Sequence, residues 1–321
     1  MNRSDPRDAP GHLAQALKDN AGVLAAFLVL LVLVSVFVPN FLTRVNFIGL
    51  ALSVSLVGML SSTMLFCLAA GDFDLSVESV VAFSGVLAAV VVNATGSVTL
   101  GIAAGILAGG AVGLANGAVI ALVGINALIT TLATMQIVRG LGFIVSHGKA
   151  VGVTREGFFF LGNSFFLGIP TPIWITAACF LAFGILLHQT TYGRRTLAIG
   201  GNKEAARLAG VAVERVKIAI FTVQGLVAGL AGVVLASRMT SGQPNTSVGL
   251  SLDVISACVL GGVSLSGGGG TILGTVLGVL IMGTVQNAMN LLNIPTFYQY
   301  VARGVILLLA VLFDRFHRRR G

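Results

Sequence analysis

Charged residues are scarce in this chain: Asp, Glu, Lys and Arg make up only 9% of its 321 residues. A soluble globular domain has about 25%, because its surface has to be hydrated. Here 56% of the residues are hydrophobic and a further 42 are glycine. A soluble domain of this size cannot bury so much apolar material. The composition therefore excludes a soluble protein and predicts a single integral membrane domain.

Signatures of catalysis and metal binding are also missing. No G-x-x-x-x-G-K-[ST] phosphate-binding loop occurs, since Gly148-Lys149 is followed by Ala150 and the glycine run 267–270 by Thr271. The three cysteines lie apart in apolar segments, which argues against a disulfide framework or a zinc site. The four histidines are scattered, without metal-ligand spacing. We therefore expect a chain that is not an enzyme and holds no metal or cofactor of its own.

The apolar residues fall into ten segments, each close to the length of about 17–25 residues that crosses a bilayer as a helix. The sequence thus predicts an all-α, polytopic membrane protein. The third segment begins among acidic residues, and the eighth is short and runs into the glycine run 267–270. Either of them can be a broken or re-entrant helix, which is tolerated only where protein or water surrounds it. The predicted spans are residues 22–38, 46–70, 75–93, 98–123, 126–147, 167–188, 217–237, 251–265, 271–292 and 298–313.

Basic residues indicate the orientation of these spans. With the N-terminus in the cytoplasm, 13 of the 19 Lys and Arg residues fall inside, five fall outside, and Arg139 lies within a span. Such an excess is typical of loops facing anionic lipid and does not indicate nucleic-acid binding. We expect both termini in the cytoplasm, with tails at residues 1–20 and 314–321 on either side of a transmembrane domain at 21–313.

Residues 189–216 form the only long polar connection on the cytoplasmic side. Within it Lys203 to Leu208 is an uninterrupted run of helix-forming residues, with Asn202 as a plausible N-cap and Gly210 as a stop. This short helix can be a docking element for a cytoplasmic partner or a solvated linker. Helix propensity alone favours the linker.

Glycines recur at intervals of four in the fourth span. This spacing places five of them on one helix face, where a neighbouring backbone can approach closely. Tight helix packing is the favoured interpretation, and a transporter would add only that smooth faces let helices slide or rock. These glycines are Gly101, Gly105, Gly109, Gly113 and Gly117, and Gly270, Gly274 and Gly278 repeat the spacing.

A few ionisable residues lie in or beside the spans, where a charge costs at least about 2.5–3.5 kcal/mol on insertion scales. Arg139 is therefore a candidate for function, as are Asp72, Asp74 and Glu78, with Ser76 between them. The alternative for the carboxylates is a hydrated position or a helix cap. For Arg139 the alternative is a side chain that extends to the membrane surface.

Polar stripes occur on two spans. Such residues should face protein or water, so they either line a route for a polyhydroxylated solute or hydrogen-bond to a neighbouring helix. The two possibilities are about equal. The fifth span has Asn126, Thr130 and Thr134 at intervals of four, flanked by Thr131 and Gln136, and the ninth has Gln286, Asn287 and Asn290.

Several motifs identify a family. They are GDFDLSV at 71–77, NALITTLATM at 126–135, YGR at 192–194, AIGGNKEAARLAGV at 198–211 and LGGVSLSGG at 260–268. From about residue 40 to 313 the sequence resembles the permease subunits of bacterial ABC importers for monosaccharides, the ribose, xylose, arabinose and galactoside branch. Residues 135–140, 148–153, 236–244 and 296–300 are most similar to the L-arabinose members.

The resemblance implies a type II-like importer with ten spans per subunit, working as a homodimer in the bacterial inner membrane. It also implies a cytoplasmic ATPase that binds ATP and Mg²⁺ on its own chain, and a periplasmic sugar-binding protein that delivers the substrate. Residues 202–211 correspond to the helix that couples the permease to the ATPase. The implied coupling residues are Tyr192, Gly193, Arg194, Asn202, Glu204, Ala205, Ala206 and Gly210.

One position departs from the family pattern. Its members usually have glycine where this chain has Glu78, which predicts looser packing or more hydration of residues 71–79. The competing hypothesis for the whole chain is a self-sufficient facilitator or ion-coupled carrier. A proton-coupled carrier is disfavoured, because proton relays need more buried charges than this sequence has.

Overall fold

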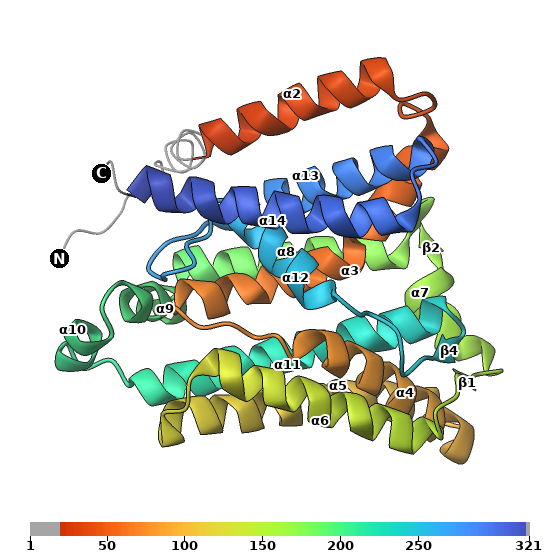
Figure 1. The fold of residues 1–321 in the computed structure, drawn as a ribbon. Helices are drawn as coiled ribbons and strands as arrows, with labels where there is room; N and C mark the ends of the chain where they lie inside the picture. Colours follow the sequence, from red (N-terminus) through yellow and green to blue (C-terminus); the bar gives the residue numbers. More distant parts are fainter. Residues whose placement is uncertain (1–19, 319–321) are drawn as a thin grey trace.

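The computed structural model describes residues 20–318 and consists almost entirely of helices (Figure 1). Four two-residue strands form two small antiparallel pairs, β1 with β4 and β2 with β3. The elements in chain order are α2 (Ala21–Phe37), α3 (Arg44–Ala69), α4 (Val77–Thr95), α5 (Val98–Ala118), η2 (Val119–Val123), α6 (Ala127–Ser146), β1 (Val151–Gly152), η3 (Glu156–Phe159), α7 (Phe160–Asn163), β2 (Phe165–Phe166), β3 (Ile169–Pro170), α8 (Thr171–Gln189), α9 (Thr191–Gly201), α10 (Lys203–Leu208), α11 (Val213–Arg238), β4 (Ser241–Gly242), α12 (Leu250–Leu260), α13 (Ile272–Leu291) and α14 (Thr296–Arg318).

Each predicted span corresponds to one helix. Among the described residues, seven helices are long and apolar enough to cross a membrane, and α2, α12 and part of α14 are shorter apolar helices. With 11 residues, α12 is about 16 Å long at 1.5 Å per residue, well short of the bilayer core. The predicted tail at 1–20 lies outside the described residues except for Asn20, as do 319–321, and α14 continues through 314–318.

Two of the crossings combine a helix with non-helical chain. The helix α3 ends at Ala69, residues 70–76 are non-helical, and α4 begins at Val77. The helix α12 is preceded by non-helical residues 243–249 and followed by a second non-helical stretch, 261–271. These interruptions are at the two places where the sequence suggested broken helices.

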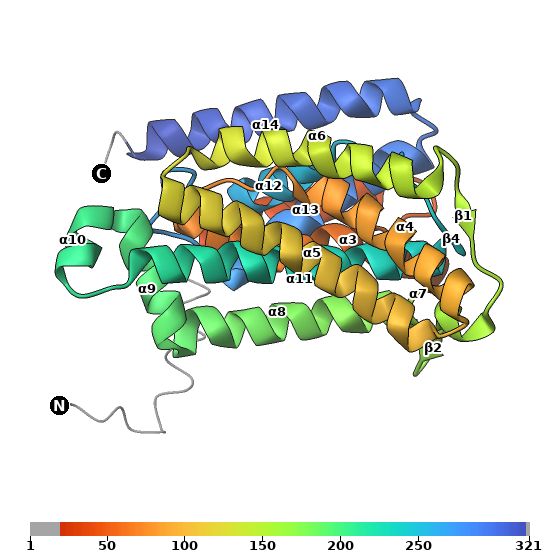
Figure 2. The same ribbon diagram turned by 90° about the horizontal axis from the view of Figure 1, so that it is seen from below.

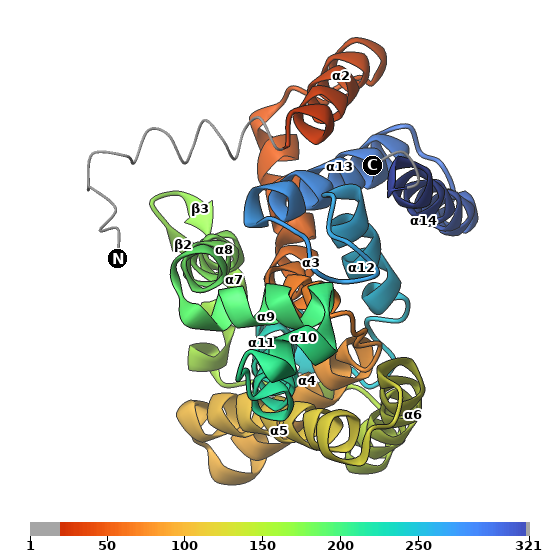
Figure 3. The ribbon, with the colours of Figure 1, turned by 90° about the vertical axis from the view of Figure 1, so that its left-hand side faces the viewer.

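The helix ends define two ends of the molecule. One end, which we call the α10 end, contains α9, α10, the start of α2 and the end of α14 (Figure 1). The strands and α7 lie at the opposite end (Figure 2). Viewed from the α10 end, α3, α4 and α11 lie centrally, α5 and α6 on one side, and α2, α13 and α14 on the other (Figure 3). The main apolar core lies where α3, α4, α11 and α12 meet, and the three cysteines are buried.

The glycine face of α5 packs directly on α11. A Cβ added at Gly113 would overlap the carbonyl oxygen of Phe221 and lie 3.1 Å from Gly225 Cα. Gly105 meets α4 in the same way, because its added Cβ would lie 2.8 Å from the Ser84 carbonyl oxygen. Tight packing, the favoured interpretation of the repeat, is therefore confirmed. Glycines on α13 pack likewise against α12, with Gly278 against Ala257.

This contact predicts a local cost of adding one methyl group. Gly113→Ala should destabilise the protein by about 1–3 kcal/mol, because backbone atoms of α11 cannot yield as a side chain would. Gly140→Ala on α6 is the matched control, since no atom lies within 4 Å of its added Cβ; helix propensity alone should stabilise it slightly. Unfolding of both variants in mixed detergent micelles measures the difference. Equal stabilities would contradict the packing argument.

Candidate functional site

Helices α4 and α12, which follow the non-helical segments 70–76 and 243–249, are here called the interrupted helices. Their first turns meet at Glu78. This residue is the second of α4, and its Oε2 accepts hydrogen bonds from the N–H of Gly249 (2.8 Å) and the hydroxyl of Ser251 (3.1 Å) at the start of α12. A carboxylate at a helix N-terminus accepts free N–H groups and is stabilised by the helix dipole. Glu78 thus links α4 to α12, and its burial contradicts the expected looser packing or hydration of residues 71–79.

Arg139 on α6 completes this contact. Its guanidinium pairs with Glu78 Oε1 at 3.2 Å and donates to the carbonyl oxygens of Pro244 (3.1 Å) and Thr246 (2.7 Å). The side chains of Arg139 and Glu78 are only 14% and 10% exposed, so Arg139 does not extend to the surface. The ion pair satisfies backbone groups of the non-helical segment 243–249 and fixes that segment between α4, α6 and α12.

A second ion pair lies at the other side of α12. Asp253 Oδ2 is 3.2 Å from Arg303 on α14, and the Arg303 guanidinium lies over the ring of Tyr300. Both pairs join a carboxylate in the first turn of an interrupted helix, α4 or α12, to an arginine on a peripheral helix. We call the four charged residues Glu78, Arg139, Asp253 and Arg303 the polar layer. Transporters commonly bind solutes where discontinuous helices place their N-terminal ends.

The remaining acidic candidates lie in the 70–76 segment. Asp72 pairs with Lys217 of α11 at 2.7 Å. Asp74 Oδ1 accepts from the N–H (2.9 Å) and hydroxyl (2.6 Å) of Ser76. The Ser76 hydroxyl in turn accepts from the side-chain amide of Asn116, at 3.0 Å. Asp72, Asp74 and Ser76 therefore connect 70–76 to α11 and α5.

The polar stripe of α6 bonds mainly to protein groups. Asn126 caps its own helix by accepting from the N–H of Leu128, while Thr130 and Thr131 bond to carbonyl oxygens one turn earlier. Thr134 donates to Asn116 of α5 at 2.7 Å. Helix-to-helix bonding therefore accounts for Thr134, whereas Gln136 is exposed and none of the hydrogen bonds described here involves its side chain.

The stripe of α13 shows the same pattern. Asn287 exchanges two hydrogen bonds with Asn46 of α3, at 3.0 and 2.8 Å. Asn290 accepts from the side chain of Gln299 on α14 at 2.8 Å. These amides join α13 to its neighbours.

Segment 189–216, which the sequence assigns to the cytoplasmic side, contains two helices, α9 and α10. The helix α10 covers Lys203 to Leu208 as predicted: Asn202 Oδ1 accepts from the N–H of Ala205 at 2.9 Å, and Gly210 has a φ of +82° just after the helix. The helix α9 was missed because of its glycines, although Tyr192, Thr196 and Ile199 are spaced as on one helix face. The Tyr192 ring packs on Phe66 of α3, with centroids 5.7 Å apart.

The helix α10 protrudes from the bundle (Figures 1 and 2). Ala206 is buried, but Glu204, Ala205 and Gly210 are exposed, as is Arg194 on α9, while Gly193 packs against the backbone at Leu187. Leu208 is 89% exposed, an apolar side chain at the tip of a protruding helix. Arg207 bonds to Glu214 at the start of α11 and so joins α10 to α11, and this bond raises the pKa of the guanidinium.

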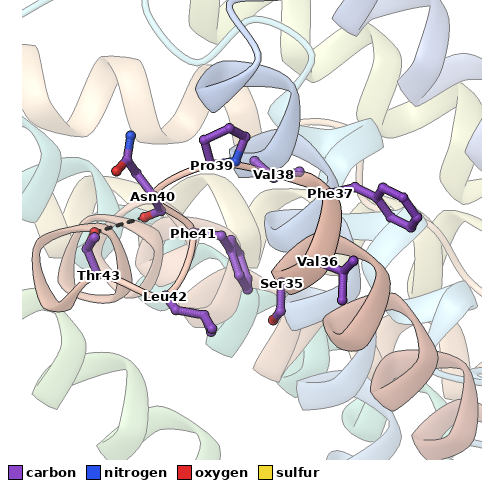
Figure 4. A pocket seen from close by; sticks show the side chains of 9 residues that line it. All are labelled: Ser35, Val36, Phe37, Val38, Pro39, Asn40, Phe41, Leu42 and Thr43. Carbon is purple, nitrogen blue, oxygen red and sulfur yellow. Dashed lines mark hydrogen bonds between the residues drawn. The ribbon is translucent and has the colours of Figure 1, made fainter.

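A hollow in the surface lies away from the polar layer. It has a volume of about 330 Å³ and is lined by residues 35–43, the turn between α2 and α3 (Figure 4). The Thr43 hydroxyl donates to the Asn40 carbonyl within this turn, at 2.9 Å. The walls of the hollow come from one short stretch of chain, and no residue of the polar layer lines it.

Comparison with known proteins identifies the family. A profile described as "branched-chain amino acid transport system / permease component" matches residues 46–311, which include the polar layer, α9 and α10. The chain belongs to this permease family. It is a multi-pass, all-α membrane subunit of an ABC transporter and not an enzyme, as the sequence predicted.

Curated relatives cover nearly the whole permease. It is 58% identical to the L-arabinose ABC transporter permease protein AraH of Azospirillum brasilense, over 98% of this chain and 93% of that protein. It is 62% identical to the L-arabinose transport system permease protein AraH of Escherichia coli, over 94% and 92%. The ribose import permease protein RbsC of Bacillus subtilis is 41% identical over 92% of each chain. No solved structure matches the permease.

Several residues of the permease site escaped sequence reasoning. Lys217 looked like an ordinary cytoplasmic lysine, and Asp253 is a single carboxylate in an apolar segment. Arg303 had one weak signal, since Arg303-Gly304 echoes Arg139-Gly140. Leu208 had none, because exposure of one leucine depends on the tertiary position of its helix.

The Glu78–Arg139 pair predicts a stability difference. Glu78→Gln or Arg139→Gln alone should destabilise the permease by about 3–5 kcal/mol, because each leaves a buried charge without its partner. The double variant should be more stable than either single one. Denaturant unfolding in mixed micelles measures this, with Glu156→Gln, an exposed residue at the opposite end, as control. Single variants as stable as this control would disprove the pairing.

Proposed function

We propose that this permease forms the membrane pathway of an ATP-driven importer for L-arabinose. The main support is the identity of about 60% to two permeases named for L-arabinose transport, over nearly the full chain. Identity to the ribose permease is lower, at 41%. The L-arabinose and ribose permeases belong to the same family, so the higher identity to the L-arabinose permeases favours L-arabinose over ribose as the substrate.

We place the solute path along the polar layer. Glu78, Arg139, Asp253 and Arg303 come from α4, α6, α12 and α14 and are only partly accessible. Carboxylates accept and guanidinium groups donate hydrogen bonds, which suits a polyhydroxylated solute. Asn126, Thr130, Thr131, Thr134, Gln136, Asn287 and Asn290 remain proposed path residues, and for all but Gln136 the hydrogen bonds described above compete with that role.

The proposal includes partners and orientation. The α10 end would face the cytoplasm and bind an ATPase through α10, while the opposite end would meet a periplasmic sugar-binding protein. Two copies of the permease would form the importer in the bacterial inner membrane. Both termini, including the tails proposed at 1–20 and 314–321, would then be cytoplasmic, in line with the excess of Lys and Arg on that side. ATP and Mg²⁺ would bind to the ATPase.

The docking role of α10 can be tested at Leu208. Leu208→Asp should lower co-purification of the ATPase by at least about tenfold, as expected when an interface anchor is lost, without lowering permease abundance. Leu167→Asp is the matched control, because Leu167 is 78% exposed at the opposite end. An ATPase that binds both variants equally would contradict docking at α10.

The substrate can be tested in a strain that lacks its own arabinose and ribose importers. The permease, expressed with its ATPase and sugar-binding protein, should restore uptake of labelled L-arabinose but not of D-ribose. Restored ribose uptake alone would overturn the choice of sugar. Sugar entry into liposomes that contain only the purified permease would instead favour the facilitator hypothesis.

A further inference from the structure

The segment that contains α9 and α10 packs against both non-helical stretches, at the end of α3 and before α13. At the backbone, the N–H of Gly268 donates to the carbonyl oxygen of Ala69 at 2.9 Å, joining the end of α3 to the stretch before α13. The end of α9 lies against this bond. A Cβ added at Gly200 would lie 2.5 Å from the Gly268 nitrogen, and one at Gly267 would lie 2.8 Å from Gly200 Cα. Three backbones thus pack together without a side chain between them.

An ion pair forms the second contact. Lys217 Nζ lies 2.7 Å from Asp72 Oδ2, and each side chain is 11% exposed. Lys217 is in the second turn of α11, the helix that follows α10 and is joined to it by the bond between Arg207 and Glu214. Asp72 lies in the non-helical segment 70–76 that leads into α4. These two ion pairs connect α10 through α11 to the approach to α4.

Hydrogen bonds extend this connection to the helices around the proposed path. Asp74, two residues after Asp72, accepts from Ser76. Ser76 accepts from Asn116 of α5, whose side-chain oxygen accepts from Thr134 of α6. Coupling between distant sites requires such a physical connection between elements that both sites bias.

We propose that Asp72 and Lys217 are positioning residues that transmit the displacement of α9 and α10 to the interrupted helices. This inference rests on the proposed function, because the displacement would come from the ATPase. A purely structural pair would only neutralise two buried charges. The two roles predict different results when both charges are removed. A neutral pair has no desolvation cost, so a purely structural role would be preserved. It also has no electrostatic attraction between α11 and segment 70–76, so transmission of the displacement would be lost.

The decisive variant is therefore Asp72→Asn combined with Lys217→Met. The complete importer, permease with ATPase, is reconstituted in liposomes, and ATP hydrolysis and L-arabinose uptake are measured with and without the sugar-loaded binding protein. We expect the double variant to retain the ATPase subunit and basal hydrolysis. Stimulation by the binding protein and uptake should fall about tenfold, the size of a typical coupling between sites. Lys149→Met, an exposed lysine at the opposite end, is the control.

Charge exchange provides the rescue. Asp72→Lys with Lys217→Asp restores an ion pair and should recover stimulated hydrolysis to within about threefold of the unmodified importer. Stimulated hydrolysis and uptake that stay within about twofold in the neutral double variant would overturn the proposal. So would an exchanged pair that assembles normally but is as inactive as the neutral one.

Two neighbouring glycines of α9 test the contact between the three backbones without changing any charge. Gly200→Ala should separate the three backbones and lower stimulation, whereas Gly201→Ala should not, because no atom lies within 4 Å of its added Cβ. Equal stimulation in both variants would count against the backbone junction. Failure of the proposed function would look different, since the unmodified permease would then bind no ATPase at all.

Discussion

A chain that leaves the helix inside a bilayer must satisfy its backbone polar groups with other parts of the protein. This requirement determines the centre of the permease. In segment 243–249 the carbonyl oxygens of Pro244 and Thr246 are satisfied by Arg139, and the N–H of Gly249 by Glu78. Because the two charged side chains also neutralise each other, the interrupted segment and the ion pair depend on one another.

The 70–76 interruption meets the same requirement with shorter-range bonds. The N–H of Asp72 donates to the carbonyl of Cys67, and that of Ser76 to the Asp74 side chain. The freed carbonyl of Ala69 is satisfied from the other interruption, by Gly268. The two breaks are thus not separate defects in two helices. A hydrogen bond from Gly268 to Ala69 joins them.

Local patterns predicted most of the fold. Apolar length located the spans, and Asn202 and Gly210 predicted both ends of α10, because caps and stops act within a few residues. Sequence could not predict which partners the polar residues choose. Thr134 bonds to Asn116, and Asn287 to Asn46, across different helices, so the spacing that suggested a solute path equally suits contacts that only the tertiary arrangement brings together.

Glu78 shows how one side chain can change the meaning of a family pattern. At a position where glycine is usual, hydration or looser packing was a reasonable expectation. The carboxylate instead reaches Gly249 and Ser251 at the start of α12. No local signal could have shown this, because the partner lies more than 170 residues away in the chain.

The glycine contacts between α5 and α11 have a mechanical consequence. At Gly113 and Gly109 the neighbouring atoms are main-chain atoms of Phe221, Gly225 and Gly229, so the backbones of the two helices interdigitate. Sliding one past the other would drive carbonyl oxygens into α-carbons. We therefore expect α5 and α11 to move as one unit, so that any rearrangement of the permease takes place at other helix contacts.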